Sequence, residues 1–340
     1  MPDRRLHLCV IVVWNFPVLP YFVAFVESVL ALKKGLVLAT GFLRRLGGCT
    51  QPILAQASDG LAYVVKFTNN VTGSNVNFNE AMGTELYRAC GLAVPAWRTV
   101  YVSGDFIDRN PDCWMTGIDQ QAERIRPSVG LCFASRFLDG KDARLVEILP
   151  GTAYCRVRRS RNFWTAWLLD ACSLHSDARQ AIFHRRDDAC YDATFVDHGH
   201  MFGGPDGRDT PRPGFARFWD PRIYPFLSSE DRSEILGRFK SFDSDALWRK
   251  LETLPEQWVT QLEPNAFHTA LDNLSCARVL EETLDLLISS HRKWFEERES
   301  YKDTNRKDDI FPALFPRFNH PWQRTGAAEG SACNPVGAHG

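Results

Sequence analysis

The pattern of hydrophobic and polar positions is most informative between residues 163 and 205. Its first part carries large apolar residues at helical spacing, which predicts a helix with one buried face. Two short apolar runs, at residues 181–183 and 193–196, then predict two strands joined by a charged turn. Asp177 stands just before the first run and Asp197 directly after the second. Each predicted strand therefore has an aspartate beside it.

Earlier in the chain, residues 39–97 have the pattern of a small β-rich unit with one helix. Residues 61–67 alternate so that Lys66 shares a strand face with Val64, and a lysine in that setting is costly to bury without an anionic partner. Asn79 is predicted to cap a helix that runs to Cys90. Glu80 would then lie in its first turn, where the helix dipole favours a carboxylate.

The remaining pattern predicts further strands at residues 51–57, 98–102 and 130–138. Helical periodicity follows the charged hairpin. It covers residues 229–240, 244–253 and 276–298.

The order of these parts points to phosphoryl transfer. A glycine turn (Gly47-Gly48), a strand lysine and a helix glutamate are the nucleotide-binding parts of a kinase N-lobe, and two aspartates follow them here. In such enzymes one carboxylate orients or deprotonates the attacking hydroxyl, and the other holds the metal that neutralises the phosphates.

On these residues the chain resembles the HipA-like kinase family, in the branch with DG-x-x-YVVKF and D-x-RQ motifs. The resemblance spans roughly residues 38–262. The matching segments are Asp59 to Phe67 (DGLAYVVKF), Asn79-Glu80, Gly91 to Pro95 (GLAVP), Asp177 to Gln180 (DARQ) and Val196 to Gly199 (VDHG).

This resemblance implies a two-lobed α+β kinase-like fold and transfer of the γ-phosphate of ATP to a hydroxyl acceptor, with protein Ser/Thr as the favoured class. Lys66 would hold the phosphates and Glu80 would orient Lys66. Asp177 would orient the nucleophile, and Asp197 with Gln180 would hold Mg²⁺ or Mn²⁺. The nucleotide would also contact the glycine turn and the hinge. The cofactor-binding residues implied are Lys66, Gly47, Gly48, Arg136, Phe137 and Leu138.

The resulting division of the chain has four parts. They are a hydrophobic N-terminal extension (1–37), a β-rich N-lobe (38–140), a mainly helical C-lobe with the catalytic hairpin (141–318) and a disordered tail (319–340). Residues 8–26 carry no charge, but Pro17 and Pro20 interrupt them, so a packed extension is favoured over a membrane anchor.

Composition narrows the picture further. The formal net charge of −1 gives no field that would attract nucleic acid. The ten cysteines include no C-x-x-C pair, which is typical of a reducing compartment and not of a disulfide framework. Together with the use of ATP, this predicts a cytoplasmic location.

Two alternatives stay open at this stage. Kinases usually place a metal-binding Asn five residues after the catalytic Asp, whereas this chain has Ile182 there, so a catalytically weak nucleotide-binding scaffold is the main rival. The second alternative is a zinc hydrolase that would use His198, His200 and His175 around Asp197.

Overall fold

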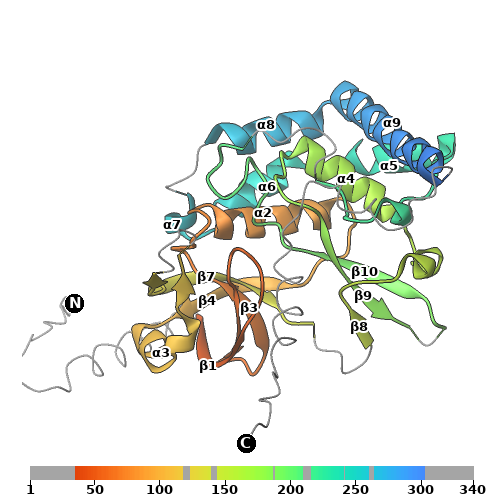
Figure 1. Cartoon of the computed structure of the whole chain (residues 1–340). Coiled ribbons are helices and arrows are strands. Elements are labelled where there is room, and N and C mark those ends of the chain that lie inside the picture. The colour runs from red at the N-terminus through yellow and green to blue at the C-terminus, as the bar shows by residue number, and fades with distance from the viewer. Residues whose placement is uncertain are drawn as a thin grey trace, which may run out of the picture.

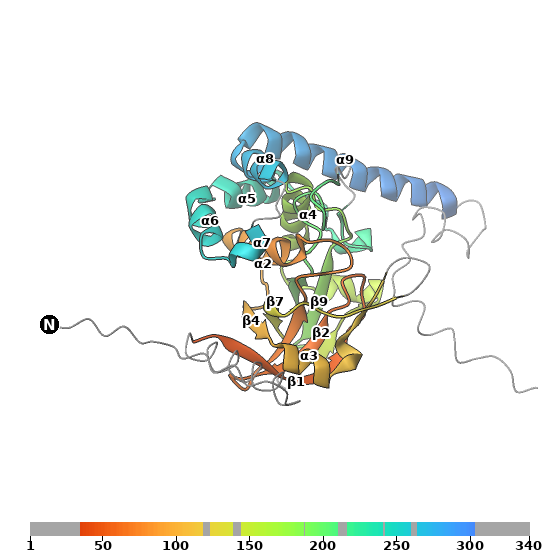
Figure 2. The same ribbon diagram turned by 90° about the vertical axis from the view of Figure 1, so that its left-hand side faces the viewer.

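The computed structural model describes residues 35–117, 123–138, 144–186, 188–209, 216–240, 242–259 and 264–302. It is an α+β structure in which a barrel lies below a layer of helices (Figures 1 and 2). The predicted N-terminal extension, up to residue 34, and the predicted tail lie outside the described residues. No helix among the described residues is long and apolar enough to cross a membrane.

Five strands close the barrel in an order that brings the first and fourth side by side. The β1–β4 pair is parallel, and the other neighbours are antiparallel. Around the barrel the strands are β1 (Val37–Arg45), β2 (Ile53–Ala57), β3 (Ala62–Lys66), β7 (Gly130–Arg136) and β4 (Trp97–Val102). Val65 and Phe67 point into its core, as their alternation predicts, and both are fully buried.

The predicted hairpin forms the second sheet. Strand β9 (Gln180–Arg185) lies between β10 (Tyr191–Val196) and the short strand β8 (Arg144–Val146). All three are antiparallel to their neighbours. Outside these sheets lies a small two-stranded sheet of β5 (Met115–Thr116) and β6 (Arg124–Ile125).

The helices are α2 (Val76–Ala89), α3 (Gly104–Arg109), α4 (Asn162–Cys172), α5 (Ser229–Lys240), α6 (Ser244–Leu251), α7 (Glu256–Val259), α8 (Pro264–Ser275) and α9 (Ala277–Lys302). Three short 3₁₀ segments, at residues 111–113, 151–156 and 221–223, complete the described elements. Helix α4 is the helix that large apolar residues predict, and Trp164 and Trp167 stack on each other within it.

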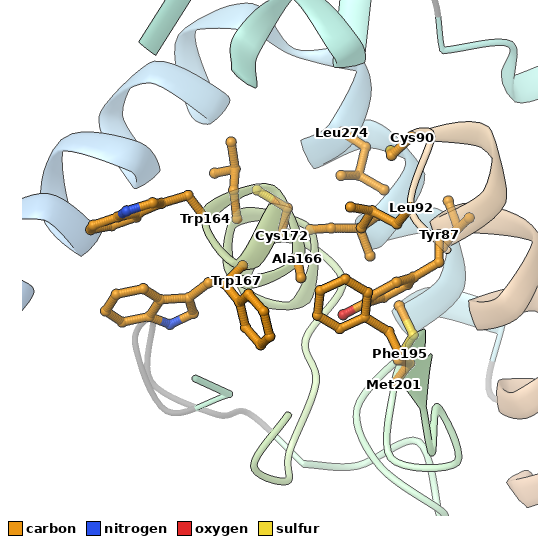
Figure 3. Close-up of a cluster of buried hydrophobic side chains, with 14 of the residues drawn as sticks. Tyr87, Cys90, Leu92, Trp164, Ala166, Trp167, Cys172, Phe195, Met201 and Leu274 are labelled. Carbon is orange, nitrogen blue, oxygen red and sulfur yellow. The ribbon is translucent and has the colours of Figure 1, made fainter. Parts of the chain in front are cut away.

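Helix α2 shares its core with the helices, and it also contacts strand β7 of the barrel. Its Leu86 and Tyr87 belong to the same hydrophobic cluster as residues of α4 and α8, and Phe133 of β7 joins that cluster, whereas most barrel residues form a separate one. Figure 3 shows Tyr87 beside Phe195 of β10, with Leu274 of α8 above them. In Figures 1 and 2, α2 lies between the barrel and the upper helices.

The start of α2 corrects one prediction. The helix begins at Val76 with Asn75 at its N-cap, so Asn79 is not the cap and Glu80 is not in the first turn. The stretch before Asn79 is polar enough to read as a loop, but Val76 and Phe78 are fully buried and extend the helix backwards. The end of the helix agrees with the prediction, because Gly91 follows it with a positive φ of 70°.

Candidate active site

Lys66 is the point at which three distant segments meet. It ends β3, and its ammonium forms ion pairs with Glu80 of α2 and with Asp197, which follows β10. The distance from Lys66 Nζ to Asp197 Oδ1 is 2.7 Å. The structure therefore brings together the lysine, the glutamate and the second aspartate that the sequence singles out.

Lys66 and Asp197 stabilise each other as ions, whereas burial, and then Asp197, raise the pKa of Glu80. Burial alone would lower the pKa of Lys66, but Asp197 and Glu80 outweigh it and raise that pKa above its ordinary value. Burial would likewise raise the pKa of Asp197, yet the neighbouring Lys66 ammonium holds it well below the usual range. Asp197 is thus an anion at neutral pH, with 26% of its side chain exposed.

The segment after Asp197 is bound closely to α2. Gly199 N donates to Glu80 Oε1 at 3.0 Å, and Asn79 Nδ2 donates to the carbonyl oxygens of Gly199 and Gly204, each at 3.0 Å. A Cβ at Gly199 would lie 3.2 Å from Glu80 Oε1, which explains the glycine. Sequence reasoning missed this role of Asn79, because a side chain that reaches across to another segment leaves no local signal.

Asp177 lies in the turn between α4 and β9. Its Oδ1 accepts from the backbone N–H of Ala178 at 2.7 Å, and the neighbouring Ser176 N donates to His200 O at 2.9 Å. The second hydrogen bond joins this turn to the segment that carries Asp197. His175 is buried in the same turn, and its Nδ1 lies 2.7 Å from the carbonyl oxygen of Asp177.

The strand register places Gln180, and not Ile182, beside Asp197. Gln180 pairs with Val196 at the start of the hairpin, and its Nε2 donates to Asp197 Oδ2 at 2.9 Å. Ile182 lies two residues further along β9, opposite Thr194. The connection after Asp177 is short, so β9 begins three residues after that aspartate. Gln180, and not residue 182, is therefore the side chain beside Asp197.

Gly47 and Gly48 lie in the loop between β1 and β2, and Gly48 has a φ of 114°. Burial raises the pKa of the next residue, Cys49, and the Asp177 and Asp197 carboxylates raise it further.

The predicted hinge residues lie at the end of β7. Arg136 N donates to Ala96 O at 2.7 Å, and Phe137 N donates to Ala62 O at 2.9 Å. These two N–H groups are satisfied within the barrel, so a nucleotide base would need other groups of this segment. Leu138, at the end of the described segment, is half-buried.

The donor set fits a nucleotide bound with Mg²⁺ or Mn²⁺. Both ions prefer oxygen ligands, and they are usually held by one or two carboxylates together with substrate phosphates. Asp197 is ionised and partly exposed, and the amide of Gln180 lies beside it, with Nε2 donating to Asp197 Oδ2. This amide would present its oxygen to a cation after it turns end for end. Lys66 supplies the positive charge that phosphates require.

The geometry does not favour zinc. Arg179 Nη1 lies 3.3 Å from Nδ1 of the buried His198, and a permanent cation there opposes the binding of a metal ion. Among the described residues, no group of three or more His, Cys, Asp or Glu side chains is placed to hold a metal ion.

No protein family model matches the chain, and no curated protein matches it. Among solved structures, it is similar to the proinflammatory kinase CtkA of Helicobacter pylori, at 13% identity over 72% of this chain and 94% of that chain, with a TM-score of 0.44. It is similar to the Golgi casein kinase at 11% identity over 74% of this chain and 73% of that chain, with a TM-score of 0.48.

A structure of the Golgi casein kinase with Mn/ADP bound is similar at 12% identity, over 80% of this chain and 76% of that chain, with a TM-score of 0.38. These solved neighbours are kinases. All three TM-scores lie below 0.5, so the site geometry, and not these likenesses, supports the proposal that follows.

Proposed function

We propose that this chain is an ATP-dependent phosphotransferase of the HipA-like type, with two kinase-like lobes, that transfers the γ-phosphate to a hydroxyl group. The observation that carries the proposal is the ion pairing of one buried lysine with both Glu80 and Asp197. A strand lysine paired with a helix glutamate, beside an aspartate at a strand end, is the arrangement that kinases use to bind nucleotide and metal.

In this proposal each residue has one task. Lys66 binds the phosphates, and Glu80 fixes its position. Asp177 accepts a hydrogen bond from the acceptor hydroxyl and orients it for attack. Asp197 would hold Mg²⁺ or Mn²⁺, joined by the amide oxygen of Gln180 once its hydrogen bond from Nε2 to Asp197 is exchanged, and the ion would supply the positive charge that phosphoryl transfer requires.

A protein serine or threonine is the acceptor class that the family resemblance favours. The location that suits this activity is the cytoplasm, where ATP is abundant.

The test is transfer of labelled γ-phosphate from ATP to water and to a panel of hydroxyl acceptors. Asp177→Ala should lower the rate by about 10²- to 10⁴-fold, the usual contribution of a positioned acid or base, and leave nucleotide binding intact. Asp192→Ala, on β10 and paired with the exposed Arg186, is the matched control and should keep wild-type activity. A wild-type protein that binds nucleotide without turning it over would instead be the catalytically weak scaffold.

A further inference from the structure

Arg179 is a buried charge for which the proposed mechanism has no direct use. Its side chain is 1% exposed, and that of its partner Asp170 is 0% exposed. Arg179 Nε and Nη2 donate to the two carboxylate oxygens of Asp170, both at 2.8 Å. Asp170 projects from the otherwise apolar helix α4, so the pair lies inside the helical core.

Such a pair is an expensive way to stabilise a fold. Removing both charges from water costs several kcal/mol, and apolar replacements of similar volume are often neutral or more stable. A buried ion pair can instead serve to fix the conformation of a neighbouring segment. The remaining donor of Arg179, Nη1, identifies that segment as the end of β10.

Nη1 of Arg179 binds the end of β10. It donates to Val196 O at 2.9 Å and to Asp197 O at 3.1 Å, which are consecutive carbonyl groups. In an extended strand consecutive carbonyls point to opposite sides, so one donor reaches both only where the chain turns. The chain does turn there, because Asp197 has a φ of 64°.

That backbone conformation is unusual for a residue with a side chain, although aspartate tolerates it better than most. It persists where surrounding contacts determine it. Here the turn directs the Asp197 carboxylate to Lys66 on one side and to Gln180 on the other. Gln180 directly follows Arg179 in the chain, so the hydrogen bonds of two neighbouring residues fix both the backbone and the side chain of Asp197.

Arg179 also contacts α2. Its guanidinium lies 4.8 Å from the centre of the Tyr87 ring. A lysine could not replace these contacts, because a point charge lacks the planar set of donors that serves a carboxylate, two carbonyls and an aromatic face together.

We propose that Arg179 is the positioning residue of the metal site, holding the backbone turn that aims the Asp197 carboxylate at the cation and Lys66. It acts through Asp197 and does not touch the nucleotide. The inference rests on the proposed function for the identity of the ligand, but the backbone turn can be measured without one.

The main variant replaces the pair by apolar residues, Asp170→Leu with Arg179→Met, since such replacements usually preserve the fold. Arg179→Lys is the second variant and keeps the charge. Arg222→Lys is the matched control. Arg222 also forms hydrogen bonds and an ion pair with the carboxylate of a buried aspartate, Asp220, and among the described residues it forms no hydrogen bond or ion pair with residues 196–203. Circular dichroism and thermal melting establish that each variant folds.

Two measurements follow. The first is Mn²⁺ affinity in the presence of ADP, by electron paramagnetic resonance. The second is hydrogen exchange of peptides covering residues 196–203 without any ligand. We expect the double variant and Arg179→Lys to bind Mn²⁺ about 10- to 100-fold more weakly, the usual effect of losing a group that supports a metal ligand. We expect faster exchange of that segment in both, and wild-type values in Arg222→Lys.

Folded variants with wild-type Mn²⁺ affinity and wild-type exchange would overturn the inference. Should the wild type bind no Mn²⁺ with ADP, the proposed function fails and hydrogen exchange alone decides. Faster exchange at residues 196–203 would then still support the positioning role, and unchanged exchange would refute it. If the double variant does not fold, Arg179→Lys is judged by the same two readings.

Discussion

The barrel has a core of its own, in which Ile53, Val65 and Phe67 are fully buried, whereas α2 shares its core with α4 and α8. The two regions contribute unequally to the site. The barrel supplies Lys66 and the glycine loop, and the helical region with its hairpin supplies Glu80, Asp177 and Asp197. The Lys66–Glu80 ion pair therefore joins the barrel to the helical region.

The contacts of helix α2 restrict its motion. A helix with Phe78, Leu86 and Tyr87 fully buried in a shared core cannot move away without breaking that core. Hydrogen bonds also cross between the regions, since Trp258 Nε1 of α7 donates to Leu131 O of β7 and Asn77 Oδ1 of α2 accepts from Phe133 N. These hydrogen bonds hold strand β7 against α7 and α2, so α2 is attached both to the helical core and to the barrel.

The largest expected effect on stability comes from Lys66, the charged side chain by which the barrel takes part in the site. Lys66→Met leaves Glu80 and Asp197 buried side by side without a cation, which should cost about 3–5 kcal/mol of unfolding free energy at pH 8. The loss should shrink at pH 5, because protonation relieves the two carboxylates. Urea denaturation at both pH values measures it.

Lys250→Met is the control for that variant. Lys250 lies 4.9 Å from the centre of the Trp97 ring and 3.8 Å from Glu85 Oε1, with 38% of its side chain exposed, so its loss should change stability by no more than about 1 kcal/mol. Equal effects of the two variants would contradict the role of Lys66 as a link between the barrel and the helical region.

A smaller effect tests how closely α2 packs on the segment that follows Asp197, residues 198–201. A Cβ added at Gly83 would lie 2.5 Å from Met201 Sδ and 2.6 Å from His198 Cβ. Gly83→Ala should therefore destabilise by about 1–3 kcal/mol, although alanine is the better helix former. At Gly237 on α5 an added Cβ meets nothing within 4 Å, so Gly237→Ala should stabilise by up to about 1 kcal/mol. Thermal and urea unfolding compare the pair, and stabilisation by both would disprove the close contact.

The smallest effect concerns pH. Burial, together with Arg179, lowers the pKa of His175 to about 3. The pKa of His175 in the folded protein lies below the unfolded value of about 6.5. The buried neutral imidazole therefore contributes its full stabilisation above about pH 6.5, and this stabilisation is lost as the pH falls toward about 3.

His175→Asn should therefore lose less stability than the wild type between pH 6.5 and pH 5, by about 1.4 kcal/mol per pH unit at most. The exposed His268→Asn variant should follow the wild type. Parallel curves for the wild type and His175→Asn would show that His175 is not buried as a neutral group.

Local patterns predicted much of this structure. Alternation located β3 and the β9–β10 hairpin, and helical spacing located α4 and, residue for residue, α5. Motif order singled out Lys66, Glu80 and Asp197, which the structure brings into contact.

The D-x-RQ motif led to Gln180 as the neighbour of Asp197, and the register of β9 against β10 brings the two side chains into contact. Two further features depend on contacts between separate segments. The membership of α2 in the helical core depends on packing that periodicity does not describe. The sequence indicates Asp170 as an acid in an apolar helix that would support the catalytic turn, but it does not indicate that the partner of Asp170 is the buried Arg179.

The central claim is that the Lys66–Asp197 pair marks a nucleotide–metal site. Its most direct test is a thermal-shift titration with ATP, with and without Mg²⁺ or Mn²⁺, on the wild type, Asp197→Ala and the control Asp192→Ala. A bound ligand at a hundredfold excess over its dissociation constant stabilises by about 2.7 kcal/mol. We predict a metal-dependent rise in melting temperature for the wild type and Asp192→Ala that disappears in Asp197→Ala. No shift in any protein under any condition would contradict the claim.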